Sequence, residues 1–178
     1  NDANLFQPET AVNSGAIKVL RNATMKHLDY TIWSSPVMGQ GLQAFSPNTL
    51  ASRIYEYNTS SDTWAVTTGN FVAGKGIMFR APNLFDDGYY PNAYTYTGEF
   101  IGTPHNGDIT VNFTATDGTY QGVGNPYPSN MDVEEFWMNN AGTGTLYFWT
   151  NTNAWDSTLN TGNGDYVANN WATYSDLG

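Results

Sequence analysis

Aromatic side chains are the residues of this sequence best suited to binding a ligand. The chain contains six Trp and twelve Tyr, and an exposed, rigid ring can stack on the face of a sugar. Trp33 and Trp149 fall within β-rich runs, which favours a place in the core. Trp155 lies in a run of Asn and Thr, and Tyr89 and Tyr90 lie in a turn-rich stretch. We therefore expect Trp155, Tyr89 and Tyr90 to form a glycan-binding platform.

A second candidate site is an oxygen-rich loop near the C-terminus. Asp156, Asn160, Asn163 and Asp165 supply side-chain oxygens within ten residues. Calcium takes about six to eight oxygen ligands from Asp, Asn and backbone carbonyls. The spacing does not match an EF-hand, and Asx-Gly pairs also serve ordinary turns. These four residues are the predicted ligands of a structural calcium ion, with plain turn chemistry as the alternative.

The residue types of catalytic sites are sparse. The chain has no cysteine, which excludes disulfides, thiolate catalysis and Cys-based metal sites. His27 and His105 stand far apart and in contexts typical of surface residues. The acidic pairs at 86–87 and 134–135 could serve a glycosidase, but a strand places neighbouring acids on opposite faces and a helix start favours acids. We expect no enzymatic activity and no catalytic residues.

The charge balance narrows the class of partner. Six Lys and Arg stand against sixteen Asp and Glu, which gives a net charge of −10 and a pI near 4.2. Nucleic-acid binding needs clustered cations, and so does docking on anionic lipid. No apolar run is long enough to span a membrane. The expected partner is a neutral polysaccharide, because an acidic surface repels an anionic one unless calcium bridges the two.

The elements that must position these residues are mainly strands. Alternating or β-rich runs occur at 16–20, 28–33, 53–57, 77–80, 93–101, 109–114 and 145–149. The Asn106-Gly107 pair predicts a hairpin between the strands at 93–101 and 109–114. A helix is expected at 132–139, capped by Ser129 or Asn130. The pattern predicts an all-β protein, a jelly-roll-like β-sandwich with one short helix.

The chain is expected to have one main domain and to be part of a longer protein. Residues 1–24 differ in character from the remainder of the chain and are interpreted as a linker or the end of a preceding β-rich region. Residues 25–178 are interpreted as the β-sandwich module, truncated at its C-terminus. Neither end resembles a natural start or stop of a protein, so neighbouring domains are expected partners.

Several segments resemble a module of large secreted proteins of Bacteroidota, notably flavobacteria. The resemblance covers about residues 15–178 and rests mainly on Leu28–Val37, on Gly-Asn-Pro-Tyr-Pro-Ser at 124–129 and on Gly-Thr-Leu-Tyr-Phe-Trp-Thr at 144–150. It implies an all-β module, export by the type IX secretion system and an extracellular, cell-surface location. It implies no catalytic residues.

Two functions are consistent with these observations. The first is a non-catalytic extracellular module of a large cell-surface, filament or adhesin-like protein, which contacts neighbouring domains or other surface proteins. The second is a glycan-binding accessory domain of a secreted polysaccharide-degrading enzyme. The neighbouring sequence would separate them, since stalk repeats favour the first and a hydrolase or lyase domain favours the second.

Overall fold

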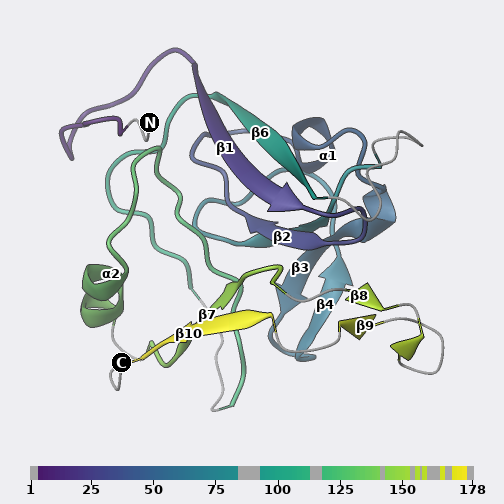
Figure 1. The fold of residues 1–178 in the computed structure, drawn as a ribbon. Helices are drawn as coiled ribbons and strands as arrows, with labels where there is room; N and C mark the ends of the chain where they lie inside the picture. The colour runs from purple at the N-terminus through teal and green to yellow at the C-terminus, as the bar shows by residue number, and fades with distance from the viewer. Residues whose placement is uncertain are drawn as a thin grey trace. The chain divides into compact units, whose positions relative to one another are not determined.

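The computed structural model describes residues 4–83, 93–112, 118–140, 143–152, 155, 156, 158, 159, 165, 166 and 170–175. Within them, strands dominate, and α2 is the only helix longer than about one turn (Figure 1). The predicted all-β, sandwich-like fold with one short helix is confirmed. The elements are β1 (Ile17–Met25), β2 (Tyr30–Trp33), α1 (Leu42–Phe45), η1 (Ala51–Arg53), β3 (Ile54–Asn58), β4 (Thr63–Val66), β5 (Ile77–Arg80), β6 (Tyr94–Gly102), α2 (Val133–Asn139), β7 (Leu146–Trp149), β8 (Trp155–Asp156), β9 (Asp165–Tyr166) and β10 (Trp171–Tyr174).

The chain divides into two compact units, residues 1–130 and 131–178. The first unit holds a four-stranded antiparallel sheet in the order β2-β5-β3-β4 and an antiparallel ribbon of β1 and β6. The second unit holds α2 and two antiparallel ribbons, β10-β7 and β8-β9.

The β1–β6 ribbon shows how the sequence alternation sets the two faces. Its register pairs Val19 with Phe100 and Leu20 with Glu99. Because side chains alternate along a strand, Val19 and Phe100 point into the core, whereas Leu20 and Glu99 remain exposed. The strand expected from the alternation at 93–101 is confirmed as β6.

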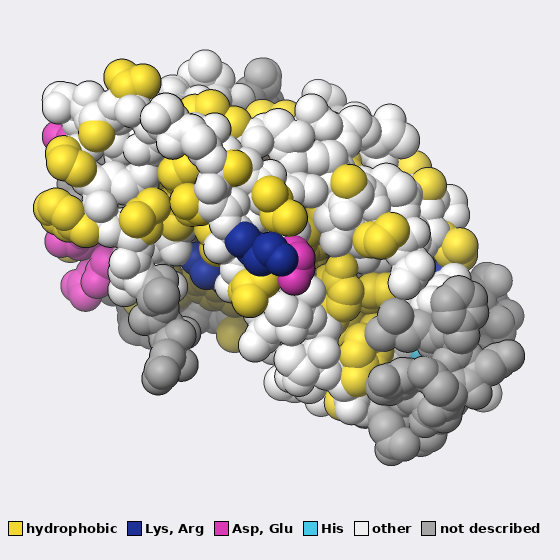
Figure 2. Space-filling model, turned by 90° about the horizontal axis from the view of Figure 1, so that it is seen from above, with side chains coloured by type: hydrophobic (Ala, Val, Ile, Leu, Met, Phe, Trp, Pro, Cys, Tyr) yellow, Lys and Arg dark blue, Asp and Glu magenta, His cyan; other side chains and the backbone are white. Residues whose placement is uncertain are grey.

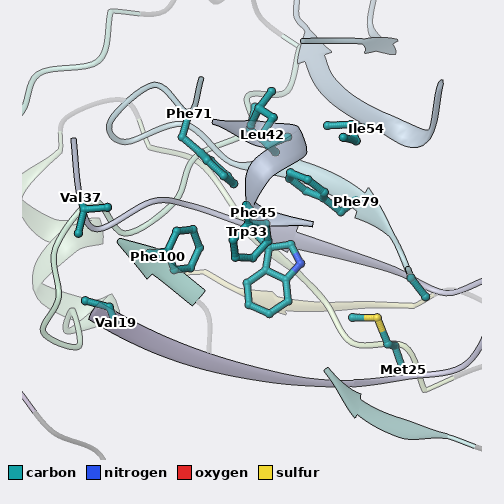
Figure 3. Packing of buried hydrophobic residues seen from close by; sticks show 12 residues of the cluster. Val19, Met25, Trp33, Val37, Leu42, Phe45, Ile54, Phe71, Phe79 and Phe100 are labelled. Carbon is teal, nitrogen blue, oxygen red and sulfur yellow. The ribbon is translucent and has the colours of Figure 1, made fainter. Parts of the chain in front are cut away.

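The core of the first unit is built around an aromatic cluster (Figure 3). Phe45 of α1 is its hub, because its ring stacks on Phe100 at 4.4 Å and contacts Trp33, Phe71 and Phe79 edge to face at 5.1–5.4 Å. Edge-to-face and offset-stacked pairs are the arrangements that aromatic rings prefer. The hub joins the β1–β6 ribbon to the four-stranded sheet, which makes this unit sandwich-like.

The prediction of a hairpin at Asn106-Gly107 is wrong. Residues 109–112 form no strand, and β6 pairs with β1 instead; residues 113 and 114 lie outside the described residues. The Asn106 side chain donates to the carbonyls of Pro8 and Ala11 at 2.7 and 2.9 Å. The turn therefore holds the N-terminal segment, a tertiary contact that the local pattern could not show.

The residues around the expected boundary at residue 24 are ordered parts of the first unit. β1 crosses residue 24 and pairs along its whole length with β6. Farther upstream, Asn13 donates to the Pro104 carbonyl at 2.9 Å, and the Leu5 carbonyl accepts from Ser129 at 2.8 Å. The chain divides into its two compact units after residue 130.

The predicted helix is present as α2, but its cap differs. Asp132 has extended backbone angles, and its carboxylate accepts from the Glu135 N–H at 3.0 Å, so Asp132 is the N-cap. Ser129 is occupied by its bond to Leu5. Asn125 closes the preceding Pro-rich turn, because its side chain accepts from the Tyr127 N–H and donates to the Ser129 carbonyl.

Few charged side chains lie on the face of the protein that Figure 2 shows. Hydrophobic side chains on this face are scattered among uncharged polar groups. Among the described residues, no helix has the length and hydropathy to cross a membrane.

Candidate functional site

The predicted glycan-binding platform lies almost entirely beyond the described part of the chain. Tyr89 and Tyr90 fall outside the described residues. Trp155 belongs to β8, where it is the cross-strand partner of Tyr166. The platform of Trp155, Tyr89 and Tyr90 therefore remains a prediction.

The predicted calcium loop is described in part. Asn160 and Asn163 lie outside the described residues, but β8 and β9 place Asp156 and Asp165 directly opposite each other. The Asp156 carboxylate accepts from the Thr158 N–H at 2.8 Å and from its hydroxyl at 2.7 Å. These bonds hold the pKa of Asp156 below its usual value. No cluster of three or more His, Asp or Glu side chains with metal-binding geometry occurs within the described residues.

A different aromatic cluster lies on the β3–β4 hairpin of the first unit. Tyr57 and Trp64 are cross-strand partners, and their rings meet edge to face at 5.1 Å. Tyr120 approaches Tyr57 from a distant part of the sequence at 6.5 Å and is 52% exposed. All three rings are at least partly accessible, which distinguishes them from the buried core rings.

Hydrogen bonds in the hairpin turn hold Tyr57 in place. The Tyr57 hydroxyl donates to the carboxylate of Asp62, a residue with the left-handed φ of 53° that Asp tolerates in turns. The Asn58 side chain accepts from the Ser60 N–H at 3.0 Å. Partial burial, together with the neighbouring Asp62, raises the pKa of Tyr57 to about 12. The ring is thus fixed before any ligand arrives.

A groove of about 380 Å³ runs beside this hairpin. Glu56 and Lys75 form an ion pair in its wall, and each side chain keeps about one third of its surface exposed, 35% and 33%. Uncharged polar side chains form much of the rest, and Tyr57 also contributes to the lining; the polar members include Asn58, Thr59, Asn112 and Gln121. The groove thus combines hydrogen-bonding groups with an anchored aromatic residue.

Close packing of two glycine-containing segments positions Lys75. The Gly76 N–H donates to the Gly122 carbonyl, and the Gly124 N–H donates to the Gly74 carbonyl, both at 3.0 Å. A Cβ on Gly76 would lie 2.7 Å from the Val123 carbonyl oxygen, closer than any real Cβ contact. Glycine at position 76 therefore permits the approach that places Lys75 opposite Glu56 of β3.

A second groove in the first unit, of about 520 Å³, offers fewer available polar groups. The Gln40 amide in its wall already accepts from the Ile101 N–H and donates to the Gly41 carbonyl. The Tyr96 hydroxyl donates to the Phe45 carbonyl at 2.9 Å. Because these groups satisfy the protein's own backbone, this groove is the weaker candidate.

The second unit has an aromatic cluster of its own on the β10-β7 ribbon. Trp149 and Trp171 are cross-strand partners with rings 5.0 Å apart, and Tyr147 meets Trp171 edge to face at 6.4 Å. The expectation that Trp33 and Trp149 are core residues holds for Trp33, which is 7% exposed. Trp149 is only partly buried.

The residues of the β3–β4 groove carry little local signal in the sequence. The run at 53–57 correctly predicted β3, and its alternation places Tyr55 and Tyr57 on one face. Nothing local indicated β4 or the approach of Tyr120 and Gln121 to β3. Lys75 and its partner Glu56 lie 19 residues apart in the sequence, so no local pattern pairs them.

The comparisons with known proteins assign a family. The chain matches, over residues 1–178, the family model described as a domain of unknown function (DUF8693), and it belongs to that family. No curated protein and no solved structure matches the chain.

Proposed function

We propose that this member of the DUF8693 family is a non-catalytic module of a longer extracellular protein, and that it binds neutral polysaccharide. The resemblance to type IX-secreted modules supports an extracellular, cell-surface location for it. Neighbouring domains or other surface proteins are the further partners that this setting implies.

The observation that carries carbohydrate binding is the anchored aromatic residue beside a polar groove. Sugar rings present apolar C–H faces and hydroxyl edges, so their binding sites combine aromatic rings with hydrogen-bonding groups. Tyr57 lies between both features, because it lines the groove and packs against Trp64. Anchoring of Tyr57 to Asp62 reduces the entropy lost on binding.

The charge distribution supports a neutral ligand over an anionic one. The chain carries a net charge of −10, and the one described cation lining the groove, Lys75, is already paired with Glu56. An anionic polymer would therefore meet long-range repulsion without a local cation to offset it. Calcium at Asp156, Asn160, Asn163 and Asp165 would reverse this preference by bridging carboxylates on both partners.

A scaffold role in an adhesin-like protein is the second candidate, and the edge of the four-stranded sheet favours it. Within the described residues, β4 pairs with β3 on one side only. An edge strand offers its backbone N–H and C=O groups to a strand of another protein. Such strand addition would link modules without any carbohydrate.

A glycan array probed with and without EDTA tests the proposed function. We expect the wild-type chain to bind neutral glycans. Binding without EDTA should be at least as strong as binding with EDTA. A Trp155→Ala variant on the same array tests the predicted platform separately from the groove. Absence of binding to every glycan would contradict carbohydrate binding and favour the scaffold role.

A further inference from the structure

We propose that the groove beside the β3–β4 hairpin binds two adjacent hydroxyl groups of a neutral sugar through the Glu56–Lys75 ion pair. This inference rests on the proposed carbohydrate-binding function and names the site and the chemical group recognised. Nothing in the residue pattern alone pointed to it, because the two partners come from β3 and from the turn before β5.

The ion pair has hydrogen-bonding capacity beyond its internal contact. An ammonium group has three donors and a carboxylate has about four acceptor sites, and the contact between Lys75 and Glu56 uses one of each. Both side chains are about one third exposed. One hydroxyl can therefore donate to Glu56 while its neighbour accepts from Lys75. Hydrogen bonds to charged groups are stronger than those between neutral groups.

The mutual pairing of the two charges also explains why a neutral sugar fits better than an ion. A lone lysine would attract any anion, and a lone glutamate would attract any cation. Held together, Glu56 and Lys75 present a strong donor beside a strong acceptor with no net charge. That is the pattern of a pair of vicinal hydroxyls, each of which can donate and accept.

The surrounding walls supply further contacts for the sugar. Asn112 and Gln121 face the hairpin from other parts of the chain, and Tyr57 lines the groove next to Glu56. The Thr59 hydroxyl donates a hydrogen bond to the Tyr120 carbonyl at 3.1 Å. This bond fixes the segment that carries Gln121 against the hairpin. The volume of about 380 Å³ falls within the range of small-ligand sites.

Affinity electrophoresis of the full chain tests this site. Native gels are cast with galactomannan, laminarin or hydroxyethylcellulose as neutral polymers and with alginate as an anionic one. The variants are Glu56→Gln and Lys75→Met. Each removes one charge of the ion pair, the first on β3 and the second in the turn before β5. The matched controls are Glu99→Gln and Lys18→Met, because this second ion pair, at 2.9 Å, lies exposed on the β1–β6 ribbon outside the groove.

The expected result is retardation of the wild type by at least one neutral polymer and not by alginate. Each groove variant should lose about tenfold in affinity, the effect of one charged hydrogen bond, while both controls keep wild-type retardation. A 2-deoxy methyl glycoside should compete less well than its parent methyl glycoside. Thermal unfolding of each variant confirms that it is folded.

Two results would overturn the inference, and they differ. Retardation of the wild type that Glu56→Gln and Lys75→Met leave unchanged would refute the groove but leave the carbohydrate-binding function intact. Absence of retardation by every polymer, together with a blank glycan array, would refute the function and the groove together.

Discussion

Gly98 of β6 lies directly against the ring of Phe45, so closely that a Cβ on Gly98 would be 2.5 Å from the Phe45 Cζ atom. This contact allows Phe45 to stack on Phe100 and to join the β1–β6 ribbon to the four-stranded sheet. The glycine is therefore required for packing and not for an unusual backbone angle.

A Gly98→Ala substitution should destabilise the first unit by about 1–3 kcal/mol, the usual cost of overpacking a core. Thermal or urea denaturation measures this loss. Gly144→Ala is the matched control, because a Cβ there meets no atom within 4 Å. Equal stability of the two variants would contradict the role of Phe45 as the hub of the core.

Removal of the α2 cap should loosen the helix without unfolding the protein. Asp132→Ala deletes the acceptor of the Glu135 N–H and should cost about 0.5–2 kcal/mol of local stability. Hydrogen exchange of the α2 amides is the measurement, and Asp132→Asn should restore protection because Asn is an equally good cap. Faster exchange after Ser129→Ala, with no change after Asp132→Ala, would favour the cap expected from the sequence.

Tyr57 should titrate later than an ordinary tyrosine. Its pKa is raised from 10.0 to about 12 by partial burial and by Asp62. The folded state therefore keeps this proton longer than the unfolded state, so the stabilisation is complete below pH 10 and is lost as the pH rises towards 12.

Ultraviolet absorbance of the phenolate, compared between wild type and Tyr57→Phe, measures this titration. The step missing from the variant should lie near pH 12, and the stability difference between the two proteins should shrink above pH 10. A missing step at the ordinary tyrosine pKa would show that Tyr57 is not held by Asp62.

Calcium binding by Asp156, Asn160, Asn163 and Asp165 remains a prediction. Added Ca²⁺ should raise the thermal midpoint of the chain, and EDTA should reverse the increase. Asp156→Asn should abolish the response. An identical thermal midpoint with Ca²⁺ and with EDTA would contradict calcium binding and indicate that these Asp and Asn residues only form turns.

Local sequence patterns correctly predicted the elements whose secondary structure depends mainly on their own residues. Alternation predicted β6, and the acidic run with its following apolar residues predicted α2. The incorrect predictions concern the turn at Asn106-Gly107 and the cap of α2. Asn106 contacts the N-terminal segment and not a hairpin partner. Asp132 caps α2 because the helix begins at Val133, which places Asp132 and not Ser129 at the N-cap position.

The candidate site was less predictable than the fold because its residues come from segments that lie apart in the sequence. Glu56 and Lys75 form a pair only because two glycine-containing segments pack closely beside β3. Tyr57 resembled any strand tyrosine until its contacts with Trp64 and Asp62 were known. The aromatic residues predicted to bind a ligand, Trp155, Tyr89 and Tyr90, were chosen for their turn-rich context, whereas Tyr57 and Trp64 of the described cluster lie on the strands β3 and β4.

The most direct test of the account is the mapping of a bound neutral oligosaccharide by amide chemical shifts in the ¹⁵N-labelled chain. The oligosaccharide is taken from the polymer that retards the wild type most. We predict shifts centred on Glu56, Tyr57, Lys75, Gln121 and Gly122, with amides of the β1–β6 ribbon unchanged. Shifts confined to other parts of the chain, or no shifts at saturating oligosaccharide, would contradict the proposal that this groove binds carbohydrate.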